Sequence, residues 1–203
     1  NGAGKTTTIK AVVGIMDFEE GDIFINGISV KEEPIKCKKI TAFIPDNPDL
    51  PEYLTGIQYL NFMADVFEVS KEERENAISK YAELFEVTGV LGDLISSYSH
   101  GMRQKICLMA NLIHRPKLWL LDEPLTGLDP QTSKALRDYM EVYKEKGNAV
   151  LYSSHNLDAV EKTCDRAYII NGGEIVADIV ISEFKKNNPN KTLEDQFMEI
   201  FEN

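Results

Sequence analysis

The sequence lacks the features that mark several classes of protein. Its 203 residues hold three widely spaced cysteines, Cys37, Cys107 and Cys164, with no C-x-x-C pair. That number and spacing cannot form a complete disulfide framework, and they predict reduced, buried thiols. The three histidines show no metal-ligand spacing, so no zinc site is expected.

Basic residues and long apolar runs are also scarce. Lysine and arginine total 22 against 33 aspartates and glutamates, a net charge of −11. This balance argues against a nucleic-acid partner, although it leaves room for a local basic patch at Lys36, Lys38 and Lys39. Purely apolar runs such as Ile179–Ile181 are far below the ~20 residues that a membrane-spanning helix needs.

What is present is ordinary for one globular domain with strands and helices in alternation. Hydrophobic residues make up 43% and charged residues 27% of the chain. Periodicity and turn residues predict helices at 5–16, 56–87, 102–114, 131–146, 157–164 and 192–202. They predict strands at 40–45, 118–122 and 148–155, the last two fully buried, and hairpins at 21–30 and 166–178. The expected fold is α/β, with a mainly parallel sheet and a helical insertion.

The first residues resemble the second half of a phosphate loop, G-x-x-x-x-G-K-[ST]. Asn1, Gly2, Ala3, Gly4, Lys5, Thr6 and Thr7 supply glycines, a lysine and a hydroxyl at the start of a helix. Glycines let backbone N–H groups wrap a phosphate, the lysine adds charge, and the hydroxyl suits Mg²⁺. Taken alone, the cluster could also be a simple helix cap. The first glycine of the motif would precede Asn1, so the strand region before the loop is expected to be missing.

A second piece is "LWLLDEP", in which an apolar strand ends in two acids. Asp122 would stand at the carboxyl edge of the sheet, where it can hold Mg²⁺ through the water shell of the ion. Glu123 would orient or deprotonate the attacking water. The alternative is a pair of solvated acids at a strand end.

"YSHGMRQK" makes the resemblance specific. Ser99, His100, Gly101 and Met102 precede a helix, and Asp122-Glu123 follow about twenty residues later. With "TGLDP" around Asp129 and "SSH" ending at His155, the order resembles that of ABC-type ATPases over essentially the whole chain. The resemblance implies a P-loop NTPase fold, with residues 47–115 as a helical subdomain and residues 1–46 and 116–203 as the core.

The resemblance also implies roles for these residues. The signature residues would bind the γ-phosphate of an ATP held mainly by a second ATPase subunit, identical or different. His155 would sense the γ-phosphate, and Asp129 would help to join the subunits. Two departures stand out: His100 and Met102 replace the usual glycine and glutamine. A third is Asp46, which stands where the family carries a glutamine; its shorter side chain would contact the metal or the attacking water.

The implied function is that of an ATP-hydrolysing transporter subunit with ATP and Mg²⁺ as cofactors. It would act at the cytoplasmic face of the membrane, dimerise around two ATP and drive a separate transmembrane permease. The final "KTLEDQFMEIF" resembles the C-terminal helix of bacterial exporter ATPases and favours export. Two alternatives remain at this point: a soluble ABC ATPase that is not part of a transporter, and a regulatory module that binds ATP without turnover.

Overall fold

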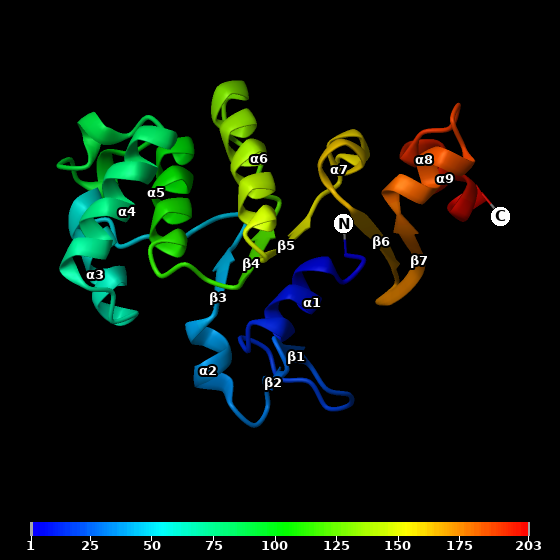
Figure 1. The fold of residues 1–203 in the computed structure, drawn as a ribbon, viewed down its shortest axis with the longest axis horizontal. Coiled ribbons are helices and arrows are strands. Elements are labelled where there is room, and N and C mark those ends of the chain that lie inside the picture. Colours follow the sequence, from blue (N-terminus) through cyan, green and yellow to red (C-terminus); the bar gives the residue numbers. More distant parts are fainter. Residues whose placement is uncertain (1, 203) are drawn as a thin grey trace.

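The structure, a computed structural model, describes residues 2–202 (Figure 1). The strands are β1 (Phe24–Ile25), β2 (Ile28–Ser29), β3 (Thr41–Ile44), β4 (Leu118–Asp122), β5 (Ala149–Ser153), β6 (Arg166–Asn171) and β7 (Glu174–Val180). The α-helices are α1 (Lys5–Val12), α2 (Pro34–Lys39), α3 (Gly56–Val66), α4 (Lys71–Leu84), α5 (His100–Leu112), α6 (Pro130–Glu145), α7 (Leu157–Thr163), α8 (Ile181–Asn187) and α9 (Leu193–Glu202). Two short 3-10 helices, Thr88–Val90 and Ile95–Ser97, lead into α5.

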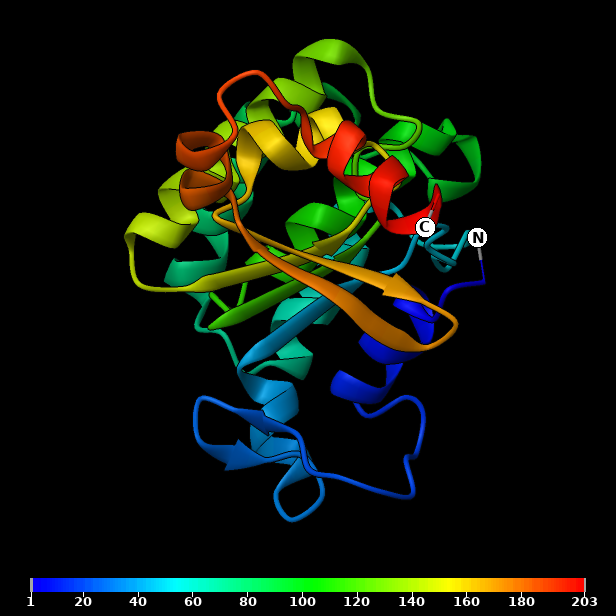
Figure 2. The same ribbon diagram turned by 90° about the vertical axis from the view of Figure 1, so that its right-hand side faces the viewer.

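The centre is a parallel sheet in the order β3-β4-β5. Ile44 lies opposite Leu121, and Asp122 lies opposite Ser153, so the carboxyl ends of the strands share one edge. The predicted strand at 118–122 matches β4 residue for residue, because its apolar run ends abruptly in an acid. Figure 2 shows α6 and α7 on one side of the strands and α1 on the other.

The prediction that β5 is fully buried is wrong. Ala149 is exposed and the Leu151 side chain is 40% exposed, because β5 is an edge strand of the described sheet. The pair β6-β7 forms a separate antiparallel sheet. Residues of β5 and β6 face each other across a mostly apolar cavity of about 250 Å³.

The helical region between β3 and β4 shares its core with the sheet. One cluster of buried side chains joins Leu60 of α3, Phe85 after α4 and Ile106 of α5 to Trp119 of β4. The predicted helical segment at 56–87 is two helices, α3 and α4, separated by a tight turn in which Glu68 has a positive φ. Thr55 and Gln58 form a reciprocal capping box that starts α3.

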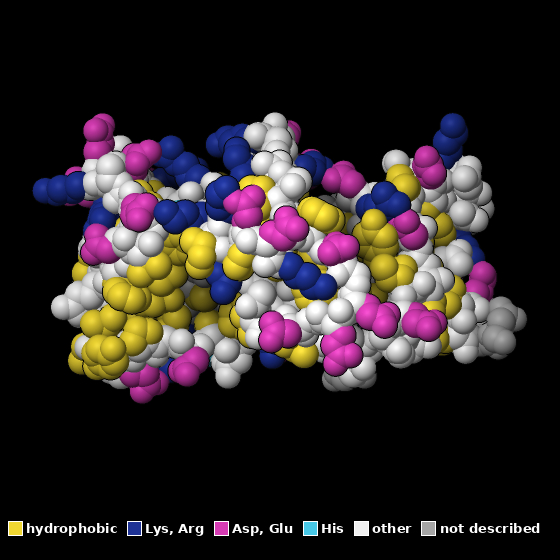
Figure 3. All heavy atoms as spheres, turned by 90° about the horizontal axis from the view of Figure 1, so that it is seen from below, with side chains coloured by type: hydrophobic (Ala, Val, Ile, Leu, Met, Phe, Trp, Pro, Cys, Tyr) yellow, Lys and Arg dark blue, Asp and Glu magenta, His cyan; other side chains and the backbone are white. Residues whose placement is uncertain are grey.

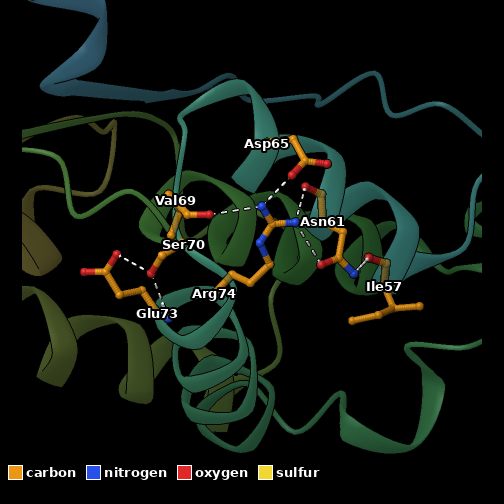
Figure 4. Close-up of polar contacts among 7 residues, drawn as sticks. All are labelled: Ile57, Asn61, Asp65, Val69, Ser70, Glu73 and Arg74. Carbon is orange, nitrogen blue, oxygen red and sulfur yellow. Dashed lines mark hydrogen bonds and ion pairs between the residues drawn. The ribbon is translucent and has the colours of Figure 1, made fainter.

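Arg74 fastens the end of α3 to the start of α4 (Figure 4). Its guanidinium donates to the Val69 carbonyl at 3.0 Å and forms an ion pair with Asp65. The same group contacts Asn61, whose amide donates back to the Ile57 carbonyl. Because the Arg74 side chain is only 17% exposed, these bonds are shielded and they hold the outer face of α3 in one orientation.

Several other predictions can be compared with the structure. Both hairpins are present, and α9 confirms the amphipathic C-terminal helix. The first helix ends at Val12, before the predicted Met16, because the chain turns at Gly14 with a φ of +68°. Helices α2 and α8 were not predicted. Cys37 and Cys107 are buried and Cys164 is partly buried, and within residues 2–202 all three are free thiols.

Candidate active site

The glycine loop before α1 is held in a conformation that favours glycine. Gly2 and Gly4 have φ values of +83° and +109°, which side chains rarely tolerate. The Ala3 carbonyl accepts from the N–H of Gly173, and a Cβ on Gly4 would lie 3.4 Å from the Gly173 Cα. The β6-β7 turn therefore fixes the loop. The positive N-terminal end of α1 directly follows the loop and faces it. Asn1, which belongs to the predicted motif, lies outside the described residues.

The loop lines a cavity of about 340 Å³ together with three acids. The lining residues are Gly2, Ala3, Gly4, Lys5, Thr6, Thr7, Asp46, Asp122 and Glu123. The sequence placed all of these in the site, although the acids are separated from the loop by up to 121 positions along the chain. The carboxyl edge of the sheet brings them together, because β3 and β4 end side by side above the loop.

Asp122 is held by two hydroxyl groups. The Thr6 hydroxyl donates to Oδ2 of Asp122 at 2.7 Å, and the Ser153 hydroxyl donates to Oδ1. Asp122 is only 4% exposed, so these bonds compensate for burying a carboxylate. Both oxygens of the carboxylate therefore have defined partners.

The Thr6 and Asp122 oxygens suit Mg²⁺. Two adjacent ligands of an octahedral Mg²⁺, each about 2.1 Å from the ion, are separated by about 3 Å. The observed 2.7 Å between Thr6 Oγ1 and Asp122 Oδ2 is close to that spacing. Within residues 2–202 there is no cluster of three or more metal-ligating side chains of His, Cys, Asp or Glu. A metal here would therefore depend on phosphate oxygens and water for its remaining ligands.

Glu123, which lines the cavity, pairs with His155, which does not line it. Nδ1 of His155 lies 2.9 Å from Oε2 of Glu123, and the two side chains are 74% and 18% exposed respectively. Glu123 adopts a φ of +50°, a strained value for a residue with a side chain. Its N–H donates to the hydroxyl of Ser153 at 3.1 Å. The carboxylate is thus aimed by its backbone as well as by the histidine.

The signature residues lie outside this cavity. Ser99 caps α5 by accepting from the Met102 N–H, and Gly101 lies close to the Gly127 carbonyl. The ring of His100 covers Gly127, where a Cβ would come within 2.6 Å of its Cδ2. Gly127 has a φ of +77°, so the turn and the histidine both call for glycine. Ser99, His100, Gly101 and Met102 therefore form a second surface, apart from the chain's own phosphate loop.

Asp129 caps the following helix. It accepts from the N–H and the hydroxyl of Thr132, and Lys105 lies 3.3 Å away. The hydrogen bonds from Thr132, followed by Lys105, hold the pKa of Asp129 well below its usual range. Asp129 thus has a structural role as the cap of α6, and the predicted role in joining two subunits stays a prediction.

Two residues that support the acids were missed by the sequence interpretation. Ser153 bonds to both Asp122 and Glu123, and the fully buried Gln104 donates to the Pro124 carbonyl at 3.1 Å. A hydroxyl at the end of a strand, two residues before the switch histidine, was the available signal for Ser153. Gln104 carried no comparable signal, because a glutamine in the interior of a helix is ordinary.

Comparisons with known proteins extend these observations. The family model described as "ABC transporter" matches residues 1–126. The ABC-type transporter ATP-binding protein EcsA of Bacillus subtilis is 35% identical over 98% of this chain and 82% of its own length. YhcH, an uncharacterized ABC transporter ATP-binding protein of the same organism, is 40% identical over 87% of the chain. The match spans 57% of the length of YhcH.

A solved structure shares the whole architecture. An ATP-binding subunit of an ABC transporter superposes with a TM-score of 0.93 at 32% identity, over 99% of this chain and 85% of the other. This overlap confirms the predicted α/β fold, including the antiparallel element and the helical insertion.

Proposed function

The chain belongs to the ABC transporter ATP-binding family and has its P-loop fold, and from this premise we propose that it binds and hydrolyses ATP to drive a transporter. One observation carries the proposal. The glycine loop, Lys5, Thr6, Asp122 and Glu123 line a single cavity, in the arrangement that phosphoryl transfer to water requires.

Each residue contributes a separate part of the chemistry. The loop N–H groups, the start of α1 and Lys5 bind the phosphates. Thr6 and Asp122 would hold Mg²⁺, which supplies positive charge that neutralises the phosphate oxygens. Glu123 accepts a proton from the attacking water, and His155 keeps that carboxylate in place. Asp46 reaches the same cavity and would contact the water or the metal from the β3 side.

A second ATPase subunit completes the site in this proposal. Ser99, His100, Gly101 and Met102 surround the N-terminus of α5, which suits an anion, yet they do not line the chain's own cavity. They would bind the γ-phosphate of an ATP held by the phosphate loop of an identical or related subunit. Binding two ATP would then close the dimer, and hydrolysis would release it.

The outer face of α3 is the proposed contact with a membrane permease. Figure 3 shows a continuous apolar area at the end of the molecule where α3 lies. Phe62 and Val66 of α3 are each 54% exposed, and Tyr53, which precedes the helix, is 80% exposed. Exposed apolar patches of this kind mark interaction sites. Within residues 2–202 the structure contains no helix long and apolar enough to cross a bilayer. The permease is proposed as a separate partner on the family resemblance.

We propose that the protein acts at the cytoplasmic face of the membrane, with the helical subdomain (residues 47–115) against the permease and the core (1–46 and 116–203) around the nucleotide. Export is the proposed direction, supported by the resemblance of α9 to the C-terminal helix of exporter ATPases. No nucleic-acid partner is proposed, since the net charge is −11.

The test is light scattering of the intact polypeptide with Glu123→Gln, with and without Mg-ATP. Gln keeps the shape of Glu123 but cannot accept a proton, so we expect a nucleotide-dependent shift from monomer to dimer. Steady-state hydrolysis should fall by roughly 10²-fold or more. A monomer under saturating ATP would contradict a homodimer. The measurement would then be repeated with the permease added, to distinguish a heterodimer from a module that binds ATP without turnover. Unchanged hydrolysis would refute the role of Glu123.

Asp46→Gln tests the remaining acid in the same assay. If Asp46 occupies the position of the family's glutamine, the longer amide should preserve or raise the turnover. A collapse of turnover would show that the shorter carboxylate works in a different geometry.

A further inference from the structure

Ser153 lies at the edge of the active site where β4 and β5 end side by side. It is the last residue of β5, directly opposite Asp122 of β4 in the parallel register. The residue is 7% exposed, and its hydroxyl makes two hydrogen bonds. It donates to Oδ1 of Asp122 and accepts from the backbone N–H of Glu123 at 3.1 Å. A single hydroxyl therefore contacts both acids.

The bond to Asp122 decides which carboxylate oxygen faces the cavity. A serine hydroxyl has one proton, and here Oδ1 of Asp122 accepts it. Oδ2 is left toward Thr6 Oγ1, 2.7 Å away, on the side of the phosphate loop. Without Ser153 the carboxylate could rotate about its last torsion, whose energy profile is broad. The hydroxyl thus holds Oδ2 in the position that suits a metal ligand.

The bond to Glu123 acts on the backbone. Glu123 has a φ of +50°, a conformation that side-chain-bearing residues adopt only when their surroundings hold them in it. Ser153 binds the N–H of that residue, and His155 binds its carboxylate at 2.9 Å. The strained turn therefore has one support on its main chain and another at the tip of its side chain.

We propose that Ser153 is a positioning residue for ATP hydrolysis, which sets the metal-facing oxygen of Asp122 and the carboxylate of Glu123 at once. This inference rests on the function proposed above. Ser153 itself binds neither nucleotide nor metal in this scheme; it acts through the two acids. Outer residues of this kind change metal affinity or activity by about 10–100-fold when they are replaced.

The test compares Ser153→Ala with Ser153→Thr in the intact polypeptide. Ala removes the hydroxyl, whereas Thr keeps it and favours the strand conformation. Ser133→Ala is the matched control, because Ser133 is also largely buried, at 9% exposed, and belongs to α6 rather than to the strands that carry the acids. Thermal unfolding of each variant reports whether it is folded. If Ser153→Ala is unfolded, Ser153→Cys, which has similar volume and a weak donor, replaces it.

Two measurements distinguish positioning from a merely structural role. The first is steady-state ATP hydrolysis as a function of Mg²⁺ concentration. The second is the affinity for a fluorescent ATP analogue with and without Mg²⁺. For Ser153→Ala we expect a fall in kcat of roughly tenfold or more and a several-fold loss of affinity only when Mg²⁺ is present. Ser153→Thr and Ser133→Ala should resemble the unchanged protein.

The outcomes separate the two proposals. If the unchanged protein hydrolyses ATP and Ser153→Ala matches it in kcat and in Mg²⁺ dependence, the inference about Ser153 is wrong while the proposed function stands. Equal loss of affinity with and without Mg²⁺ would also overturn it, because that pattern indicates a general disturbance of the site. If the unchanged protein neither binds nor hydrolyses ATP, both proposals fail together.

Discussion

We expect acid to weaken the fold through one partly buried histidine, His114. Its ring stacks on Phe67 with centroids 3.7 Å apart, and Nε2 lies 3.3 Å from the Thr41 carbonyl. Burial lowers the pKa of His114 from 6.5 to about 4, against a smaller opposing effect of the Thr41 carbonyl. The folded protein therefore keeps this ring neutral at pH values at which the unfolded chain protonates it.

The direction and the magnitude of the change in the free energy of unfolding follow from this difference in pKa. Above pH 7 the ring is neutral in both states, so its pKa has no effect on stability. Between pH 6.5 and about 4 the unfolded chain binds a proton that the folded protein does not, so the free energy of unfolding falls as pH falls. The loss from this group alone is about 2 kcal/mol at pH 5 and about 3 kcal/mol at lower pH.

Urea unfolding at pH 7.5 and pH 5, followed by the fluorescence of the single, fully buried Trp119, measures the effect. Other groups titrate over this range, so the comparison is with His114→Gln, whose amide does not titrate. The variant should be less stable at pH 7.5 but should lose about 2 kcal/mol less on acidification. His100→Gln, at an exposed histidine, is the matched control. An identical pH dependence in His114→Gln and the unchanged protein would refute the reasoning.

Two further predictions concern packing. Leu60→Ala, at a fully buried position of α3, should lower the free energy of unfolding in urea by about 2–5 kcal/mol. Val66→Ala, on the exposed side of the same helix, should change it by no more than about 0.5 kcal/mol, and similar values for the two variants would show that α3 does not bury the face described. Gly127→Ala should lower the free energy of unfolding by about 1–2 kcal/mol because of its positive φ, and by more because the new Cβ would meet the His100 ring. Gly147 has nearly the same φ with open space around it, so Gly147→Ala should show the backbone cost alone. Equal costs at the two glycines would mean that the His100 ring moves aside freely.

Much of the architecture was predictable because its signals are local. The apolar run of β4 ends in an acid, the hairpins turn at Asn-Gly pairs, and the buried face of α6 repeats at helical spacing. Helices α2 and α8 were missed because both are short and polar, with few apolar positions to show a period. The burial of β5 was predicted wrongly because an apolar strand has the same composition in the centre of a sheet and at its edge.

The candidate site also has one part that the sequence predicted and another that it did not. By itself, the sequence determined which residues are proposed to carry the chemistry: the glycine loop with Lys5 and Thr6, the acids Asp122 and Glu123, and His155. It did so because each occupies a characteristic place beside a strand or helix end, which short-range pattern reveals. Asp46 could be placed in the cavity from its position after β3, although its contribution to chemistry stays a prediction.

Only the tertiary structure decided how these residues are held. That Ser153 faces Asp122 depends on the register between β4 and β5, and that Gly173 pins the phosphate loop depends on where the β6-β7 turn lies. The packing of the His100 ring against Gly127 and the hydrogen bond from Gln104 to the Pro124 carbonyl also depend on the tertiary structure. A hydrogen bond needs its atoms to be placed to within a few tenths of an ångström. Residues 20 to 170 positions apart reach that precision only when the packing of the whole sheet sets it.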